Sequence, residues 1–376
     1  MSYDPDLRRD TPLAIKIKER IRASGPMLLS AYMNTCLNDP EHGYYRTQKA
    51  IGAGADFVTA PEISQAFGEL VGLWSAAVWQ DLGKPRPLEL VEFGPGRGTM
   101  MRDALRASRI VPGFHDALYV ALVEVNRQLA LQQAKTLAGC GVPIGHYDDV
   151  HTIFGMQQPG FGREVPRLFL ANEILDVLPI RQLQFKAGAW RHRKVGLDDR
   201  GELCFVIAQL SQIGIPISIP PPVEGDIFEV CFDHHFFLNS QVGQRANRQS
   251  LAALFIDYGH DEPGYGDTLQ AVRGHKYESV FASPGEADLT AQVDFASVAH
   301  EARRLGFVVD GPTTQAEFLG RLGIIERASK LMGANPGKAG EIEAGVMRLM
   351  APNGMGTRFK AIGIRSPTMG KLPGFE

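Results

Sequence analysis

A strand, a glycine-rich turn and a helix follow one another in the segment LELVEFGPGRGTM, residues 88–100. The apolar run ends near the acid Glu92, and glycines then occupy alternate positions, at Gly94, Gly96 and Gly98. Glycine allows a tight turn and the close approach of a ligand, because it has no Cβ. This order of elements is typical of α/β proteins that bind adenine-containing cofactors at the ends of their strands.

The remaining pattern predicts the same fold class. Short apolar segments recur at 117–125, 167–175 and 251–260, and amphipathic segments of helical period accompany them. Apolar strands separated by helices indicate a mostly parallel sheet that is covered on both faces. We therefore expect an α/β fold.

The N-terminal part of the sequence predicts helices before this pattern begins. Residues 11–38 contain two short helical segments, and a longer one follows a Thr59-x-x-Glu62 capping box. Its apolar residues recur on one helical face. We assign residues 1–84 to an N-terminal helical lid.

One segment interrupts the alternation of strands and helices. Residues 181–222 alternate polar and apolar residues around a DDRG turn, which predicts antiparallel strands, and end in a proline-rich stretch unsuited to central sheet. We assign 181–247 to an insertion with antiparallel strands and a helix. The core then has two parts, 85–180 and 248–376.

Composition excludes several classes of function. The formal net charge of -3 gives no reason to expect nucleic acid as a partner, and no apolar stretch is long enough for a membrane span. The first twelve residues carry three aspartates and no apolar core, so we expect no signal or transit peptide and a cytoplasmic protein of bacterial type. The four cysteines and ten histidines show no usual ligand spacing, so we expect no metal site.

The spacing of the glycines favours a cofactor without phosphates. The third glycine comes one residue earlier than in the dinucleotide fingerprint Gly-x-Gly-x-x-Gly, and Pro95 removes a backbone N–H that a pyrophosphate would use. S-adenosylmethionine carries no phosphate and has a cationic end. Glu92 would face that cationic part or a bridging water, and Glu124, after the next strand, would accept hydrogen bonds from the ribose hydroxyls. Two alternatives to S-adenosylmethionine remain: the turn binds a nicotinamide dinucleotide, or it binds no ligand.

A second polar group follows another apolar strand. Asn172, Glu173 and Asp176 come directly after it, and the polar segment 257–260 ends a further strand. Since ligands bind beyond the carboxyl ends of parallel strands, these groups are expected at the same edge as the glycines. Two carboxylates can hold a guanidinium in its planar fork geometry, and methyl transfer depends mainly on positioning. Alternatively, Glu173 or Asp176 caps a following helix.

Several long motifs, in their order along the chain, resemble one known family, the MidA-like proteins. These are class I methyltransferases with a Rossmann-like, seven-stranded sheet, related to a mitochondrial assembly factor of respiratory complex I. The resemblance runs from about residue 10 to 320 and is weakest across 185–247. The motifs that carry it are GADFVTAPEISQAFGELVGLW, LVEFGPGRGTMMRDAL, LVEVN, NEILDVLP, FIDYGH and PGEADLTAQVDF.

The resemblance implies that S-adenosylmethionine is the methyl donor and a protein arginine the acceptor, such as an arginine of a complex I subunit. It implies that a helix carrying Ser64 and Gln65 covers the cofactor. The three glycines and Glu124 would then bind the cofactor, and the group at 172–176 would face the acceptor. This makes the predicted function that of a protein arginine methyltransferase.

The chain departs from the family pattern at three positions, Gln270, Val272 and Gln292. They leave the cofactor motifs intact but bear on the choice of acceptor. An assembly chaperone that binds S-adenosylmethionine, and a methyltransferase of small molecules, therefore remain alternatives. The identity of the acceptor, the number of methyl groups added and the oligomeric state stay open.

Overall fold

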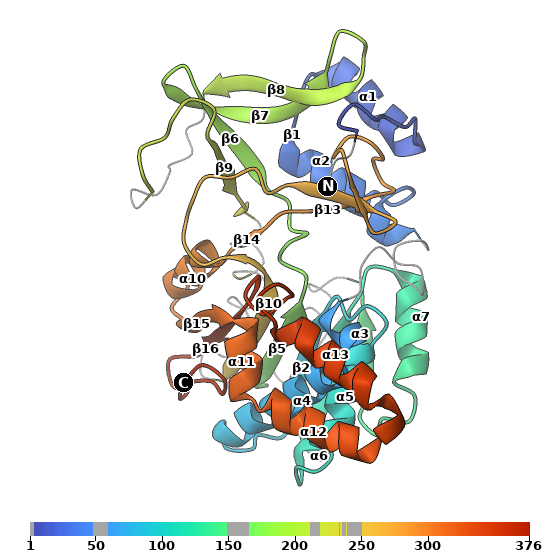
Figure 1. The fold of residues 1–376 in the computed structure, drawn as a ribbon, viewed down its shortest axis with the longest axis vertical. Coiled ribbons are helices and arrows are strands. Elements are labelled where there is room, and N and C mark those ends of the chain that lie inside the picture. The colour runs from blue at the N-terminus through green and yellow to red at the C-terminus, as the bar shows by residue number, and fades with distance from the viewer. Residues whose placement is uncertain are drawn as a thin grey trace. The chain divides into compact units, whose positions relative to one another are not determined.

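The structure is a computed structural model that describes residues 4–47, 59–148, 165–210, 219–232, 234, 238 and 250–376 (Figure 1). The chain forms two compact units, and each is described by itself. Unit 1 comprises Met1–Phe57, Asp176–Phe236 and Glu262–Gln292, and unit 2 comprises Val58–Leu175, Phe237–Asp261 and Val293–Glu376. The predicted N-terminal segment 1–84 is thus shared between the two units.

Unit 2 contains the predicted sheet. Its strand order is β15-β16-β10-β5-β2-β3-β4, and the five strands from β10 to β4 are parallel. β16 is antiparallel to β10, and β15 is antiparallel to β16. This confirms the mostly parallel sheet of seven strands, to which the short strand β14 adds an eighth beside β10. The strands are β2 Leu88–Phe93, β3 Leu118–Val123, β4 Ile144–Tyr147, β5 Arg167–Asn172, β10 Leu251–His260, β14 Val293–Asp294, β15 Val308–Thr314 and β16 Phe359–Arg365.

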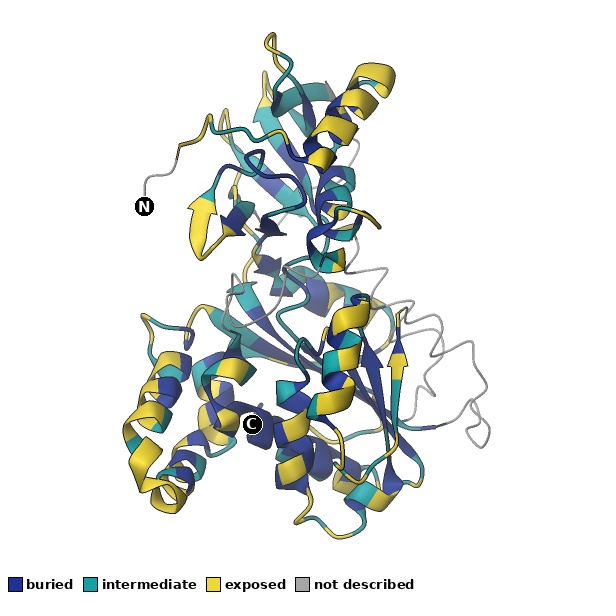
Figure 2. Ribbon diagram, turned by 90° about the vertical axis from the view of Figure 1, so that its right-hand side faces the viewer, coloured by how far each residue is buried: buried dark blue, intermediate teal, exposed yellow. Residues whose placement is uncertain are grey.

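The central strands are apolar because both of their faces are covered. Every residue of β2 is buried, and Figure 2 shows the strands of the large sheet as mostly buried. Leu90, Leu170 and Leu254 belong to one core cluster with residues of the helices that cover this face. Glu92 lies two residues beyond Leu90, so its side chain points to the same buried face.

Helices of unit 2 flank the sheet and include the segment that was predicted as one helix from Thr59. The structure divides this segment at Ser64, whose backbone is extended with φ -147° and ψ 125°. Thr59 makes no side-chain cap, so the predicted capping box is wrong; Glu62 instead bonds Thr99. The helices are α3 Ala60–Ile63, α4 Gln65–Asp81, α5 Thr99–Ser108, α6 Phe114–Ala117, α7 Arg127–Thr136, α10 Phe295–Arg304, α11 Gln315–Arg321, α12 Ile324–Ala334, η3 Pro336–Lys338 and α13 Ala339–Met350.

Unit 1 combines the first two predicted helices with the antiparallel strands of the insertion. Thr11 caps the first helix by accepting a hydrogen bond from the Ala14 N–H, as the Thr-Pro start predicts. One sheet runs β1-β7-β6-β9 with β8 on β7, and a second runs β12-β11-β13. Part of the proline-rich stretch, residues 211–218, lies outside the described residues. The elements are α1 Pro12–Ser24, β1 Met27–Leu28, α2 Leu29–Asn38, η1 Tyr44–Arg46, β6 Arg181–Lys186, β7 Ala189–Leu197, β8 Leu203–Leu210, β9 Ile227–Val230, β11 Gln270–Arg273, β12 Lys276–Glu278 and β13 Asp288–Thr290.

The sequence led us to expect no membrane span and no metal site, and both expectations can be compared with the part of the chain that the structure describes. In that part, no helix is both long and apolar enough to cross a membrane. The same residues contain no group of three or more His, Cys, Asp or Glu side chains arranged to hold a metal ion. All four cysteines are free.

Candidate active site

The glycine-rich turn joins β2 to α5 in a backbone conformation that favours glycine. Gly94, Gly96 and Gly98 have φ angles of 58°, 54° and 78°, in the left-handed region. A Cβ placed on Gly94 would collide with Ile174, whereas a Cβ on Gly96 would meet no atom within 4 Å. The backbone at Gly96 is therefore open to a ligand, whereas the backbone at Gly94 is covered by the end of the Ile174 side chain.

Glu92 lies buried at the end of β2, beside this turn. Only 2% of it is exposed, and its Oε2 has no hydrogen-bond partner among the described residues. Burial, and secondarily the charge of Glu124, raise the pKa of Glu92 to about 8. A nearby cation would favour the ionised form of such an acid.

Glu124 follows β3 and is connected to the glycine-rich turn through Gln133. Glu124 Oε1 accepts from the Asn126 N–H at 2.8 Å, and its Oε2 accepts from Gln133 Nε2 at 3.1 Å. The same Gln133 nitrogen donates to the Gly96 carbonyl at 2.8 Å. The structure thus brings Glu124 and the glycines together, as the sequence predicts.

Gln133 is the residue of this group that the sequence analysis missed. It is fully buried on α7, four residues after the buried Leu129. A spacing of four residues places both on the same helical face. A polar residue on the apolar face of an amphipathic helix was the signal that could have identified it.

The turn after β5 holds Glu173 in an unusual conformation. Its φ is 56°, which is uncommon for a residue other than glycine, and residues in such strained conformations are enriched at active sites. The fully buried Asp257, in the carboxyl-terminal half of β10, fixes this turn. Its Oδ2 accepts from the backbone N–H groups of Ile174 at 3.0 Å and Leu175 at 2.8 Å. Asp257 therefore positions the turn.

The Glu173 carboxylate already has two partners inside unit 2. Its Oε1 accepts from Asn172 Nδ2 at 2.9 Å and from the Ala60 N–H, at the start of α3, at 3.1 Å. Burial raises the pKa of Glu173, although these two bonds and the charge of Arg348 oppose the increase. Glu173 therefore does bond the start of a helix, but this helix precedes it by more than a hundred residues.

Asp176 belongs to unit 1 and is 6% exposed. The chain turns after it and enters β6 at Arg181, so the alternative that Asp176 caps a following helix is wrong. A clamp formed by Glu173 and Asp176 would require residues of both units. That clamp stays a prediction.

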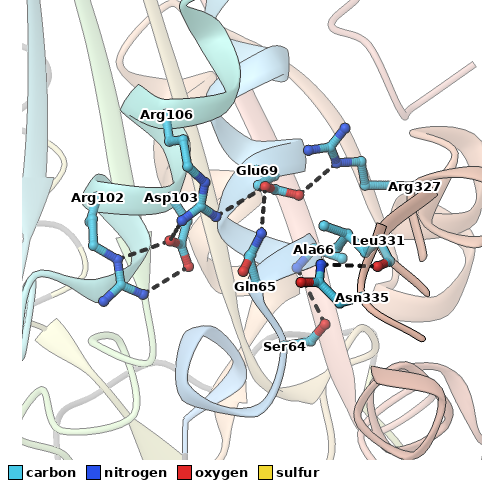
Figure 3. A network of polar contacts seen from close by, with 10 residues as sticks. All are labelled: Ser64, Gln65, Ala66, Glu69, Arg102, Asp103, Arg106, Arg327, Leu331 and Asn335. Atoms are coloured by element: carbon cyan, nitrogen blue, oxygen red, sulfur yellow. Dashed lines mark hydrogen bonds and ion pairs between the residues drawn. The ribbon is translucent and has the colours of Figure 1, made fainter. Parts of the chain in front are cut away.

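Ser64 and Gln65 make their described contacts around the start of α4 (Figure 3). Ser64 Oγ accepts from the Ala66 N–H at 3.3 Å, and Gln65 Nε2 donates to Glu69 Oε1 at 2.9 Å. Glu69 also accepts from arginines of α5 and α12, and we call this group the Glu69 network, which consists of Gln65, Glu69, Asp103, Arg106 and Arg327. A contact of Ser64 or Gln65 with a cofactor stays a prediction.

The residues around the glycine-rich turn fit S-adenosylmethionine. Three buried oxygens here have no hydrogen-bond partner among the described residues: Glu92 Oε2, Gln133 Oε1 and Asn172 Oδ1. Arg97, the cation of the turn, lies 3.4 Å from Glu62, so it is engaged by an acid. Buried acceptors and acids suit a cationic ligand with hydroxyl and ammonium donors better than a pyrophosphate.

The three departures from the family pattern lie in unit 1, whereas the glycines and their neighbours lie in unit 2. Gln270 and Val272 are residues of β11, and Gln270 Nε2 donates to Thr290 Oγ1 at 3.2 Å. Gln292 is exposed.

Comparison with known proteins supports a methyltransferase. Residues 70–313 match the family described as "Putative S-adenosyl-L-methionine-dependent methyltransferase". The protein arginine methyltransferase NDUFAF7 of Danio rerio is 35% identical over 92% of this chain and 84% of its own length. The same protein of Homo sapiens is 35% identical over 93% and 82%. A Burkholderia thailandensis structure with S-adenosyl-homocysteine bound shares the fold, with a TM-score of 0.81, 24% identity and 98% coverage of both chains.

These relatives also correct one expectation. The Danio rerio and Homo sapiens proteins are both named mitochondrial. The predicted cytoplasmic location is therefore wrong. That prediction rested only on the composition of the first twelve residues. Their composition does not determine the cellular compartment of the protein.

Proposed function

Because the chain belongs to the family of S-adenosyl-L-methionine-dependent methyltransferases, we propose that it methylates an arginine of a protein acceptor. The observation that carries the donor half of this proposal is the open Gly96 backbone beside the buried Glu92. The acceptor half is supported by the names of the relatives, which are protein arginine methyltransferases.

On the donor side, S-adenosylmethionine supplies a methyl group activated by its sulfonium charge. Gly96 lets the donor lie against the backbone, and Glu124 accepts hydrogen bonds from its ribose hydroxyls. Glu92 faces the cationic end, where its carboxylate is stabilised by the opposite charge. Gln133 keeps Glu124 and the glycine-rich turn at a fixed distance.

On the acceptor side, Asn172, Glu173 and Asp176 are the proposed contacts. A carboxylate oxygen of Glu173 that is not used by Ala60 and Asn172 can accept from a guanidinium N–H. Such a contact orients one nitrogen toward the methyl group, which is the main requirement of the reaction. The family resemblance makes a subunit of respiratory complex I our first candidate for the acceptor.

Transfer of a labelled methyl group tests this proposal. The protein is incubated with methyl-labelled S-adenosylmethionine and an extract of its own organism, and labelled polypeptides are hydrolysed to amino acids. We expect label in methylated arginine of one polypeptide. Label only in small molecules, or in another amino acid, would contradict the proposal.

Glu173→Gln provides a second arm of this experiment. Glutamine keeps the oxygen that accepts from Ala60 and Asn172, so α3 stays in place while the charge is lost. We expect near-normal donor binding and a decrease in transfer of about 10²-fold or more, as for other groups that orient or stabilise a reacting cation. Unchanged transfer in both Glu173→Gln and Asp176→Asn would exclude the carboxylate clamp.

A further inference from the structure

The short helix α3 is bonded to both turns of the candidate site. At its start, the Ala60 N–H donates to Glu173 Oε1 at 3.1 Å, beyond the end of β5. Near its end, Glu62 Oε1 accepts from Thr99 Oγ1 at 2.6 Å, and Glu62 Oε2 lies 3.4 Å from Arg97 Nη1. Arg97 lies within the glycine-rich turn and Thr99 directly after it, so α3 connects the turns that follow β2 and β5.

α3 is also a separate element from α4. The extended residue Ser64 divides the two helices, and the Glu69 network holds α4 to α5 and α12 independently of α3 (Figure 3). On its other side, α3 contacts α13 so closely that a Cβ on Gly345 would lie 2.7 Å from the Ile63 carbonyl oxygen. The bonds of Ala60 and Glu62 therefore determine how α3 meets the two turns.

We propose that α3 is a clip that fixes the glycine-rich turn relative to the turn at Asn172–Glu173, with Glu62 as a positioning residue for the methyl donor. This inference rests on the proposed function. Three glycines in the left-handed region make the turn costly in entropy to order. Glu62 orders Arg97 and Thr99 when the protein folds, so that less of this cost falls on the binding of the donor. Glu62 acts through these two residues.

Two substitutions of Glu62 test the clip by calorimetric titration with S-adenosylmethionine. Glu62→Ala removes both bonds, and we expect the dissociation constant to rise about ten-fold, as for the loss of a hydrogen bond to a charged group. Glu62→Gln keeps an acceptor for Thr99, so we expect a rise of about three-fold or less. The rate at saturating donor is measured beside it, and we expect the dissociation constant to change by a larger factor than this rate, because the reacting groups themselves are unchanged.

Thr99→Val removes the same bond from the other side and replaces Glu62→Ala in the test if that variant does not fold. We expect the double variant to bind about as weakly as Glu62→Ala, because the bond that Thr99→Val removes is already lost in that variant. In the protein without donor, the amides of Gly96 and Gly98 should exchange faster with deuterium in Glu62→Ala than in wild type.

Glu317→Ala is the matched control. Glu317 Oε2 accepts from Thr314 Oγ1 at 2.7 Å in the capping box of α11, so its loss also removes a bond between a threonine and a carboxylate. We expect a lower melting temperature and an unchanged dissociation constant. An equal loss of binding in Glu317→Ala, or wild-type binding in folded Glu62→Ala, would overturn the clip alone. Absence of binding by the wild-type protein would instead overturn the proposed function.

Discussion

The ionised form of the buried Glu92 side chain destabilises the folded state, so the destabilisation grows as a larger fraction of the side chain is ionised. Its pKa is raised from the ordinary 4.5 to about 8, first by burial. Between these values the folded state keeps a proton that the unfolded state has lost, so stability falls as pH rises from about 5 to 8. At about 1.4 kcal/mol per pKa unit, the penalty reaches roughly 3–6 kcal/mol at pH 8.

Glu92→Gln should therefore stabilise the protein and weaken its function. We expect its melting temperature to exceed that of wild type at pH 8, with a much smaller difference at pH 5, and its affinity for S-adenosylmethionine to fall. Glu229→Gln in unit 1 is the control, because Glu229 is another carboxyl whose pKa is raised by burial. Its replacement should leave donor affinity unchanged. A gain in stability with unaltered affinity would show that Glu92 does not face the donor.

Glu124 provides a second prediction at this scale. Glu124→Ala should weaken donor binding by about 1.5–3 kcal/mol, the range for hydrogen bonds to a charged group. Glu124→Gln keeps one acceptor and should lose less. Because Gln133 links Glu124 to Gly96, the alanine variant should also loosen the turn, which faster amide exchange at Gly96 would report. Wild-type affinity in Glu124→Ala would exclude the ribose contact.

At the scale of elements, the Glu69 network holds α4 against α5 and α12. Glu69 is 1% exposed, and although burial alone would raise its pKa, hydrogen bonds from Arg327, Gln65 and Arg106 lower it. This stabilisation is present above the ordinary pKa of 4.5 and is lost as the pH falls through the lowered folded pKa. The network thus contributes to stability at neutral pH and is lost in acid.

Glu69→Ala should lower the free energy of unfolding by about 1.5–3 kcal/mol at pH 7, because it removes the hydrogen bonds of Arg106, Arg327 and Gln65 to a buried carboxylate. Denaturant titration at pH 7 and in acid measures this, and the difference from wild type should shrink in acid. Asp116→Ala is the matched control: its ion pair with Arg86 is exposed, and its loss should cost about 0–1 kcal/mol. Equal effects of the two substitutions would contradict the assigned role of the network.

Local sequence patterns were sufficient for most elements but not for the boundary between α3 and α4. The period of apolar residues correctly indicated α4, and the Thr11 cap correctly indicated α1. The division at Ser64 was missed although Ser64 is a preferred N-cap residue and caps α4 by accepting from the Ala66 N–H. Ala60 and Glu62 bond residues 113 and 37 positions away, so no pattern within the segment reports these contacts.

At the scale of the whole molecule, the sequence predicted the architecture of the sheet better than it predicted which segments of the chain fold together into each compact unit. The mostly parallel sheet was predicted, and the neighbouring turns of the candidate site follow from the rule that parallel strands present their carboxyl ends at one edge. The division of the chain into two units did not follow from any pattern in the sequence. Unit 1 collects three segments that are distant along the chain, and Asp176 belongs to it although Glu173 belongs to unit 2.

The central claim is that the glycine-rich turn of unit 2 holds the methyl donor. The most direct test measures the affinity for S-adenosylmethionine in the wild-type protein, in Gly96→Ala and in Gly83→Ala. Both glycines have positive φ and open space around a Cβ, so alanine should cost each variant a similar 1–2 kcal/mol of stability. We expect wild type and Gly83→Ala to bind alike and Gly96→Ala to bind at least about ten-fold more weakly, because its methyl group would occupy the donor's position. Wild-type affinity in Gly96→Ala, or binding of NAD in place of S-adenosylmethionine, would contradict the account.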